Sequence, residues 1–449
     1  DFTEASGAAS DHDPLLVQID LIEVTGGNIN RGRDNSPKPK PEDEEPAVEF
    51  EVIKETNESG ETEIITKVTK DQVASILTEL SDENDTIIIP LEDVSEGEIA
   101  SAELPFDLFK EAAKKNNEAI VEISNKDGVY KLPISEINIS ELAKDLGVDG
   151  EEVNIVVSIN AVHSESIEDI ILKNNLNPVS DIIDFSVKAI AGEKSIDIDY
   201  FTQYVTREMI SNNQLNKDEV VAVRINDDGT FSPVPTLIEG EKAVIKSLTN
   251  SKYMLVESDQ SFSDVNGINW AEDYIEKLAS KYIIKGKEDG TYAPKEDISR
   301  AQFTVLLVRA LGLSSEEYDS RFIDVDGDEW FNAKGELMAA VKAGIIKGKE
   351  DGRFAPYEKL TREQASVMIQ RAMKFVGYDE NELDDTNKIS DFKDVDNIGS
   401  WAIDSVEIVY QAGIVTGNET GTLDPSGYTK RDQMAKILLE FLLFVDLIN

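Results

Sequence analysis

The chain of 449 residues has no cysteine and only two histidines, His12 and His163. Disulfide bridges, zinc–thiolate sites and cysteine nucleophiles are therefore excluded, and so is a metal site built from several histidines. No apolar run reaches the ~18 residues that a membrane-spanning helix needs, because the longest candidate, residues 437–448, is interrupted by Glu440 and Asp446. We therefore expect no membrane span.

Basic residues are scarce as well, with 44 Lys and Arg against 90 Asp and Glu, so the net charge is −46. A chain this acidic lacks the extended basic face that nucleic acid or an anionic membrane requires. Apolar residues still make up 40% of the chain, which predicts packed cores rather than an acidic disordered protein. No basic and apolar leader precedes Asp1, and we interpret the chain as a mature or trimmed form of an exported protein.

The part of the chain before residue 259 divides by composition. Residues 1–46 contain an apolar alternation at 15–24, which predicts a strand that pairs elsewhere or on a neighbouring molecule, and a proline-rich, charged spacer at 37–46. Strand-like runs then alternate with short helices and turn signals. We expect two β-rich modules, 47–150 and 151–258, of α+β or β-sandwich type, and neither contains a catalytic motif.

The remaining residues contain an internal repeat in three copies, 259–315, 316–385 and 386–449. Each copy has a Phe-x-Asp-Val motif, one tryptophan, a Gly-x-x-x-Gly turn, a proline four residues after the second glycine, and an arginine six residues after the proline. Apolar residues behind each arginine recur at i, i+3, i+4, i+7 and i+8. Each copy therefore predicts a helix pair with one buried face on its second helix.

The start of each second helix is also marked by its capping residues. Ser299 and Thr361 each stand three residues before a glutamine, which predicts two capping boxes. Lys430 occupies the corresponding position in the third copy, where we expect a box shifted to Thr429 and Asp432.

These residues resemble the S-layer homology (SLH) domain, which anchors bacterial surface proteins to cell-wall polysaccharide. The resemblance implies an all-α SLH triplet in a pseudo-threefold arrangement, so the expected fold is a multidomain chain in which N-terminal β-rich modules precede this triplet. Residues 130–135, 184–187, 231–236 and 250–253 resemble the β-rich stretch before such triplets in Gram-positive surface proteins.

In this family the grooves between repeats bind a pyruvylated secondary wall polysaccharide, and the resemblance implies the same acidic ligand for this chain. The resemblance implies that the cations bind the acidic sugar and that the tryptophans provide a flat wall for a sugar ring. It also implies that the aspartates accept hydrogen bonds from sugar hydroxyls and that the glycines let the ligand approach the main chain. The residues are Arg300, Arg362, Arg431 and Lys430; Trp270, Trp330 and Trp401; Asp264, Asp324 and Asp394; and Gly286, Gly348 and Gly417.

Most of these residue types also have a structural interpretation, since tryptophan anchors helices, aspartate caps them and glycine makes turns. The arginines instead favour a binding role, because a guanidinium group matches a carboxylate in geometry. A cation at a helix N-terminus also opposes the helix dipole, so its presence there needs another reason. The acidic run 324–328 lacks the glycine and distant glutamate of an EF-hand loop and is interpreted as a turn. His163 is interpreted as a surface or packing residue. We therefore expect no catalytic residues and no enzyme activity.

The sequence is thus interpreted as a secreted structural surface-layer protein that is anchored noncovalently to the cell wall, with residues 1–257 making lattice contacts. The alternatives are an SLH-anchored adhesin and a surface appendage or filament subunit. A wall-bound hydrolase would need a catalytic domain that residues 47–257 do not resemble. No cofactor is expected, and structural Ca²⁺ is the one inorganic partner left open. Because chain and wall polymer are both acidic, recognition is expected at local, salt-screened cations.

Overall fold

The computed structural model describes residues 48–56, 60–95, 97–226, 228–267 and 270–449. Residue contacts divide the chain into a unit of residues 1–47 and a unit of residues 48–449. The strand expected at 15–24 and the spacer at 37–46 lie outside the described residues.

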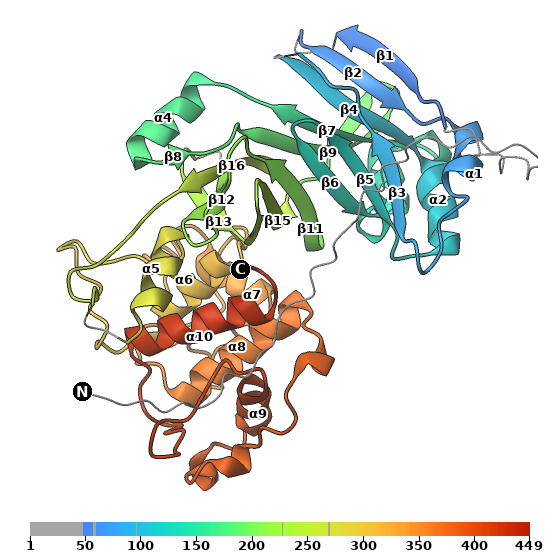
Figure 1. The fold of residues 1–449 in the computed structure, drawn as a ribbon. Coiled ribbons are helices and arrows are strands. Elements are labelled where there is room, and N and C mark those ends of the chain that lie inside the picture. Colours follow the sequence, from blue (N-terminus) through green and yellow to red (C-terminus); the bar gives the residue numbers. More distant parts are fainter. Residues whose placement is uncertain (1–47, 57–59, 96, 227, 268–269) are drawn as a thin grey trace, which may run out of the picture. The chain divides into compact units, whose positions relative to one another are not determined.

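Runs rich in Val and Ile between turn residues form two sheets in the β-rich region (Figure 1). The first sheet has the order β1 (Glu51–Thr56), β2 (Thr62–Lys67), β4 (Glu98–Pro105), β7 (Asn154–Ala161), β9 (Ile183–Ala191), β16 (Ser251–Glu257), β12 (Val220–Ile225) and β13 (Phe231–Val234), with β10 (Lys194–Asp197) beside β9 and β8 (Asn177–Pro178) beside β16. The second has the order β14 (Thr236–Glu239), β15 (Lys242–Thr249), β11 (Tyr200–Ile210), β6 (Gly128–Pro133), β5 (Ile120–Asn125) and β3 (Thr86–Pro90).

Both sheets are mixed. The pairs β2–β4 and β3–β5 are parallel, whereas β4–β7 and β5–β6 beside them are antiparallel. Side chains from both sheets pack into one apolar core together with short helices. These helices are α1 (Val73–Ile76), α2 (Phe106–Lys115) and α3 (Ile139–Leu146), with 3₁₀ turns η1 (Lys70–Gln72), η2 (Ile134–Glu136) and η3 (Gly150–Glu152). The helix α4 (Glu165–Asn174) packs in a separate apolar cluster with residues of β12 and β16.

A fully buried arginine lies in this core. Arg207, on β11, donates hydrogen bonds to three main-chain carbonyls and to Oδ1 of Asn250, and it has no carboxylate partner among the described residues. Its guanidinium carbon lies 4.8 Å from the ring centre of Tyr130, 5.5 Å from Tyr253 and 6.0 Å from Phe185. Carbonyl dipoles and aromatic faces thus offset the cost of burying the charge. Three of the four stretches that resemble the β-rich part of Gram-positive surface proteins, 130–135, 184–187 and 250–253, therefore contribute side chains around Arg207.

The helix pairs of the repeats follow in chain order, from yellow to red in Figure 1. They are α5 (Glu272–Ser280) with α6 (Arg300–Ala310), α7 (Glu336–Lys342) with α8 (Arg362–Val376), and α9 (Ile403–Gln411) with α10 (Arg431–Phe444). The 3₁₀ turns η4 (Glu380–Glu382), η5 (Ile389–Asp391) and η6 (Val395–Asn397) precede α9. Apolar residues at the predicted helical positions, Phe303, Ile369 and Leu438 among them, are buried in one continuous core.

The second helices begin in the same register in all three repeats. Ser299 and Thr361 accept the expected hydrogen bonds from the third N–H of α6 and α8. The shifted box expected in the third repeat is absent, because α10 begins at Arg431 and the Lys430 N–H donates to the side chain of Gln433 at 3.1 Å. Thr429 is buried, and its hydroxyl has no hydrogen-bond partner among the described residues.

The expected fold class is wrong. The β-rich region contains mixed sheets whose strands come from both 47–150 and 151–258, and helices join its core. The repeat region is not all-α, because the cap residues before α6, α8 and α10 are extended and pair across repeats. The bridges are Ser299 with Lys359, Thr361 with Tyr428, and Asp297 with Lys430. Helical periodicity does not reveal such short extended segments. The residue boundaries expected for the six segments stay a prediction.

Direct contacts join the β-rich region to the repeats. The Tyr204 hydroxyl donates to the Leu311 carbonyl at 2.7 Å, and the side chain of Asn449 exchanges two hydrogen bonds with the main chain of Ile238. Lys281, which follows α5, is fully buried, and its Nζ donates to the carbonyls of Lys217 at 2.6 Å and Val220 at 3.0 Å. Polar groups of the two regions therefore satisfy one another.

Candidate functional site

An aspartate clamps a loop within each repeat. The two carboxylate oxygens of Asp264 accept the N–H groups of Tyr292 and Ala293, each at 2.8 Å. Asp324 and Asp394 hold the corresponding N–H groups of their own repeats at 2.7–2.9 Å. The second residue of each held pair has a positive φ of 56–60°, which is unfavourable for a residue with a side chain. The three carboxylates therefore stabilise a strained loop and are already hydrogen-bonded.

The glycine that opens each turn faces the phenylalanine of the same repeat. A Cβ added at this glycine would lie 2.5–2.6 Å from the phenylalanine Cε1. The three pairs are Gly286 with Phe262, Gly348 with Phe322, and Gly417 with Phe392. Because the phenylalanines are buried in the core, any larger residue at the glycine would displace them.

The start of each second helix is bonded to a neighbouring repeat. In α6, the N–H of Arg300 donates to the Glu358 carbonyl and that of Ala301 to the Pro356 carbonyl, both at 2.9 Å. The first two N–H groups of α8 donate to residues 425–427 in the same way, and those of α10 to residues 294–296. Main-chain carbonyls of a neighbouring repeat therefore occupy the first N–H groups of these helices, so an anion bound there must be held by side chains.

We call these contacts seams. The first seam is Arg300 with residues 354–358, the second is Arg362 with residues 424–427, and the third is Arg431 with residues 292–296. They link the first repeat to the second, the second to the third, and the third to the first.

The arginine side chains differ among the seams. Arg300 Nε donates to the Phe354 carbonyl at 2.9 Å and its guanidinium lies 5.4 Å from the Phe354 ring. Arg431 Nε donates to the Tyr292 carbonyl at 2.8 Å, and its guanidinium lies 4.4 Å from the Tyr292 ring. Neither has an ion-pair partner among the described residues. Arg362 instead forms an ion pair with Asp424 at 2.6 Å. The first and third seams thus retain an unneutralised positive charge.

A family model of the S-layer homology domain matches residues 261–304, 321–366 and 391–435, the segments that contain these clamps and seams. The chain carries three SLH domains. Their place at the C-terminal side of a β-rich region is as the sequence resemblance implied.

Relatives of the chain include both surface-layer proteins and enzymes. An S-layer protein of Bacillus licheniformis is 32% identical over 40% of this chain and 19% of its own length. An endoglucanase of Bacillus sp. (strain KSM-635) is 37% identical over 39% of this chain and 18% of its own. An amylopullulanase of Thermoanaerobacterium thermosulfurigenes is 28% identical over 66% of this chain and 16% of its own, so that match includes part of the β-rich region.

The chain thus spans less than a fifth of the length of these curated relatives. The SLH domains and the S-layer relatives indicate a location at the cell surface, in the cell wall and S-layer. None of the helices that the structure describes is long and apolar enough to cross a membrane.

The tryptophans of the SLH repeats are all exposed, with 56% of Trp270, 52% of Trp330 and 58% of Trp401 accessible. Trp330 contacts Phe331, which packs on Phe354 with ring centres 5.7 Å apart, and the guanidinium of Arg300 lies over the Phe354 ring. No described contact joins a tryptophan to a seam arginine. The tryptophans are therefore available to a ligand, at a place apart from the arginines.

Lys430 lies between repeats rather than in solvent. Its Nζ lies 3.2 Å from Oδ1 of Asp297, whose other oxygen pairs with Lys359 at 2.7 Å. Lys359 first, and Lys430 next, hold the pKa of Asp297 below its ordinary value. Lys430 thus has a carboxylate partner already. Within the described residues, no group of three or more His, Asp or Glu side chains could hold a metal ion.

Two further cations belong to the repeats, and the sequence reasoning missed them. Arg309 and Arg371 stand nine residues after Arg300 and Arg362, a repeated spacing that is visible in the sequence. Burial lowers the pKa of Arg300 most, and the charge of Arg371 lowers it further. A bound anion would relieve this crowding at the first seam. In the third repeat the position is Glu440, which accepts a hydrogen bond from the Tyr274 hydroxyl.

Proposed function

We propose that the SLH triplet anchors the chain by binding an acidic, pyruvylated wall polysaccharide at the first and third seams. The observation that supports this is the difference in counter-ions: Arg300 and Arg431 have no described ion pair, whereas Arg362 is paired with Asp424. Each unpaired guanidinium is held at Nε by main chain and covered on one face by an aromatic ring. Nη2 of Arg431 also donates to the Lys285 carbonyl at 3.1 Å, and the orientation of both side chains suits the binding of a carboxylate by the remaining terminal N–H groups.

The net charge of −46 limits how such a polymer is approached. At about 0.1 M salt the Debye length is roughly 10 Å, so charges elsewhere on the surface are largely screened at a seam. Recognition therefore depends on the few cations next to the bound group, Arg300 with Arg371 at the first seam and Arg431 at the third. Binding is expected to weaken at very low salt, where the carboxylates of the whole chain repel the polymer.

The test is sedimentation of the full chain with purified wall sacculi. Arg300→Ala with Arg431→Ala removes both unpaired cations, and Arg362→Ala is the matched control at the second seam. A hydrogen bond to a charged group contributes roughly 1.5–3 kcal/mol, so the dissociation constant of the double variant should rise by at least about tenfold. The control should stay within about twofold of wild type.

Two results would contradict this assignment: full binding by the double variant, or an equal loss in Arg362→Ala. Sacculi stripped of polysaccharide provide the control for ligand class, and they should bind neither wild type nor variants. Circular dichroism of each variant shows whether the fold is retained.

We further propose that the β-rich region makes the protein–protein contacts of an S-layer lattice. The edge strands β1 and β3 support this, because Val52 on β1 is 47% exposed and Ile88 on β3 is 62% exposed. Unpaired strand edges of this kind pair readily with other chains. Ca²⁺ would bridge carboxylates between chains and so promote assembly.

Electron microscopy of the purified protein with Ca²⁺ and with a chelator tests this part. Ordered two-dimensional sheets that dissolve in chelator support the lattice and the ion. Filaments would instead support an appendage subunit, and single particles would support an anchored adhesin. Sheets that resist the chelator would rule out the Ca²⁺ step.

We propose anchoring rather than catalysis as the activity of this chain. About two fifths of the chain matches an S-layer protein and, in another comparison, an endoglucanase, and in both cases less than a fifth of the relative is covered. Partial matches of this size to proteins with such different names support an attachment module rather than a catalytic domain. Release of reducing ends from purified wall polysaccharide by the chain would contradict this proposal.

A further inference from the structure

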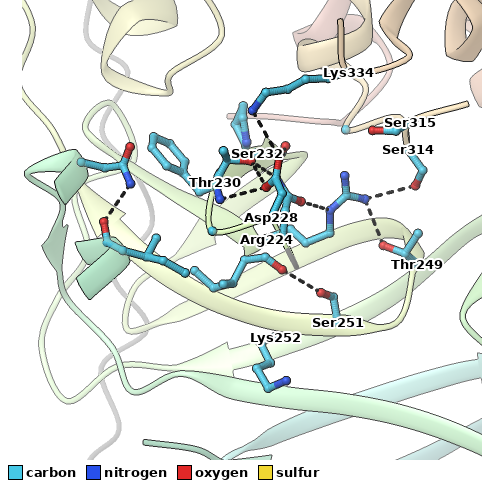
Figure 2. A pocket seen from close by; sticks show the side chains of 18 of the residues that line it. Arg224, Asp228, Thr230, Ser232, Thr249, Ser251, Lys252, Ser314, Ser315 and Lys334 are labelled. Atoms are coloured by element: carbon cyan, nitrogen blue, oxygen red, sulfur yellow. Dashed lines mark hydrogen bonds and ion pairs between the residues drawn. The ribbon is translucent and has the colours of Figure 1, made fainter. Parts of the chain in front are cut away.

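A cavity of about 1340 Å³ lies between the β-rich region and the first two SLH repeats (Figure 2). Residues of α4, β9, β12, β13 and β16 form one wall, and the segments around Ser314 and Lys334 form the other. Pockets for drug-sized molecules enclose roughly 300–1,000 Å³, so this cavity is large enough for several linked sugar units.

Side chains from the two walls meet across the cavity. Arg224 on β12 donates from Nη1 to the hydroxyls of Thr249, at 3.2 Å, and Ser314, at 3.1 Å. Lys334 approaches Asp228 at 3.8 Å from the opposite wall. Figure 2 shows both contacts, with Arg224 directed toward Ser314 and Lys334 reaching over Asp228. The cavity is therefore built from both regions, and polar contacts join its two walls.

Cations in this cavity outnumber carboxylates, although the chain as a whole is strongly acidic. The lining cations are Lys173, Arg224, Lys252, Lys285, Arg309 and Lys334, and the lining acids are Asp169, Asp184, Asp199, Asp228 and Glu336. Lys285 and Arg309 form no hydrogen bond or ion pair through their side chains within the described residues. Burial, and then the charges of Arg309 and Lys334, lower the pKa of Lys285. An anion between these groups would relieve their repulsion.

The remaining lining suits sugar rather than an apolar ligand. Trp330 and Tyr200, which are 52% and 70% exposed, offer aromatic faces from opposite walls. Hydroxyl groups, those of Thr230, Ser251 and Ser315 among them, also line the cavity and can exchange hydrogen bonds with sugar hydroxyls. Carboxylates in the lining accept from sugar hydroxyls but repel the continuous phosphates of a nucleic acid.

We propose that this cavity binds an anionic segment of a saccharide chain, with its acidic group at Lys285 and Arg309 and a sugar ring against Trp330. The β-rich region is then a carbohydrate-binding partner of the SLH repeats as well as a lattice module. The identity of the saccharide as wall polysaccharide rests on the proposed function. Within the described residues, none of the three seam arginines lines the cavity, and Arg431 contacts it only through the main-chain carbonyl of Lys285, to which its Nη2 donates at 3.1 Å.

The test uses Trp330 as a single reporter. Trp270→Phe with Trp401→Phe leaves it as the only tryptophan of the chain. The probe is wall polysaccharide fragments released from sacculi by muramidase, added to the full chain while Trp330 emission is recorded. We expect a saturable change in emission.

Three variants in this background locate the site. Lys285→Gln with Arg309→Gln should raise the dissociation constant at least tenfold, and Tyr200→Ser with Lys252→Gln on the β-rich wall should raise it severalfold. Lys114→Gln with Lys342→Gln removes the same charge from surfaces outside the cavity and should leave the constant within about twofold. Amidated fragments and fragments freed of phosphate show whether carboxylate or phosphate is the bound group.

The proposal is overturned by an absent Trp330 response, by an unchanged affinity in the Lys285/Arg309 variant, or by fragments that bind equally well without either acidic group. Wild-type affinity in the Tyr200/Lys252 variant would overturn the joint cavity. Failure of the proposed function gives a different pattern, in which Arg300→Ala with Arg431→Ala sediments normally while Trp330 still responds to the fragments.

Discussion

Lys281 predicts how the stability of this protein depends on pH. Its side chain is fully buried, and within the described part of the chain its amino group donates to the carbonyls of Lys217 and Val220 and to no other group. Burial first, and then the nearby charge of Lys277, lowers its pKa from 10.5 to about 7. Two carbonyl acceptors match the two N–H groups of a neutral amine, so the uncharged form fits this site.

The sign of the effect follows from the direction of the pKa change. Between pH 7 and pH 10.5 the unfolded chain holds a proton on Lys281 that the folded chain has released, so stability rises with pH across this window. Below pH 7 both states are protonated and the fold carries the full cost of the buried charge. At 1.36 kcal/mol per pKa unit this cost is at most roughly 5 kcal/mol, and about 2–3 kcal/mol of it disappears between pH 6.5 and 9.

The perturbation is Lys281→Met, which fills similar volume and cannot titrate. Relative to wild type, the variant should lose roughly 2–3 kcal/mol in free energy of unfolding as the pH is raised from 6.5 to 9. Urea unfolding followed by tryptophan emission measures this, because all three tryptophans lie in the SLH repeats that Lys281 joins to the β-rich region.

Lys287→Met, an exposed lysine of the same repeat, is the matched control and should follow the wild-type curve. Lys246 and Lys285 also have lowered pKa values, but their contribution is present in every variant and cancels in the comparison. Measurements stop at pH 9 because buried tyrosines with raised pKa values destabilise the fold at higher pH. Parallel curves for wild type and Lys281→Met would contradict the lowered pKa of Lys281 in the folded chain.

Three further substitutions test the fold and the seams. Arg207→Lys keeps the charge but loses the planar fork that reaches three carbonyls and an amide, and the fold should lose about 3 kcal/mol or more, measured by urea unfolding with near-ultraviolet circular dichroism. Asp324→Ala removes both acceptors from a strained loop and should cost roughly 2–4 kcal/mol, seen as a lower Tm of the repeats, whereas an unchanged Tm would show that the clamp is dispensable. Asp424→Ala frees Arg362 from its ion pair and should strengthen sedimentation with sacculi by severalfold; equal or weaker binding would contradict the role given to the counter-ion.

The repeat and its helices could be predicted because their signals are local. The spacing of Arg300, Arg362 and Arg431 behind a proline located the start of three helices, and the apolar stripe behind each arginine identified the buried face. The extended segments before these helices escaped prediction because they pair with residues far along the chain, as Asp297 does with Lys430. Parallel pairing of β2 with β4 is nonlocal in the same sense.

The candidate site was located by motif, but its chemistry depends on partners that the motif does not contain. Asp264 looked equally suited to a cap or a sugar ligand, and only the fold shows that its two oxygens hold the N–H groups of residues 292 and 293. Likewise, Arg362 and Arg300 occupy equivalent positions in the repeat and look alike in the sequence. Only Arg362 has a carboxylate partner among the described residues, and that partner, Asp424, lies 62 positions away. Such partners are distant in the sequence and can be identified only from the folded structure.

The seams bear on how SLH sequences diverge. In each seam the arginine and the residues behind it bond two repeats together through main-chain groups, whether or not the guanidinium is free for a ligand. On the proposed function, a single acidic neighbour such as Asp424 would remove the binding role of the arginine and leave its main-chain contacts between repeats intact. We therefore expect this arginine in any related sequence whose junction between repeats is intact. The charge of the residue before the proline of the next repeat, Asp424 before Pro425 in this chain, would then indicate whether the junction can bind the proposed acidic sugar.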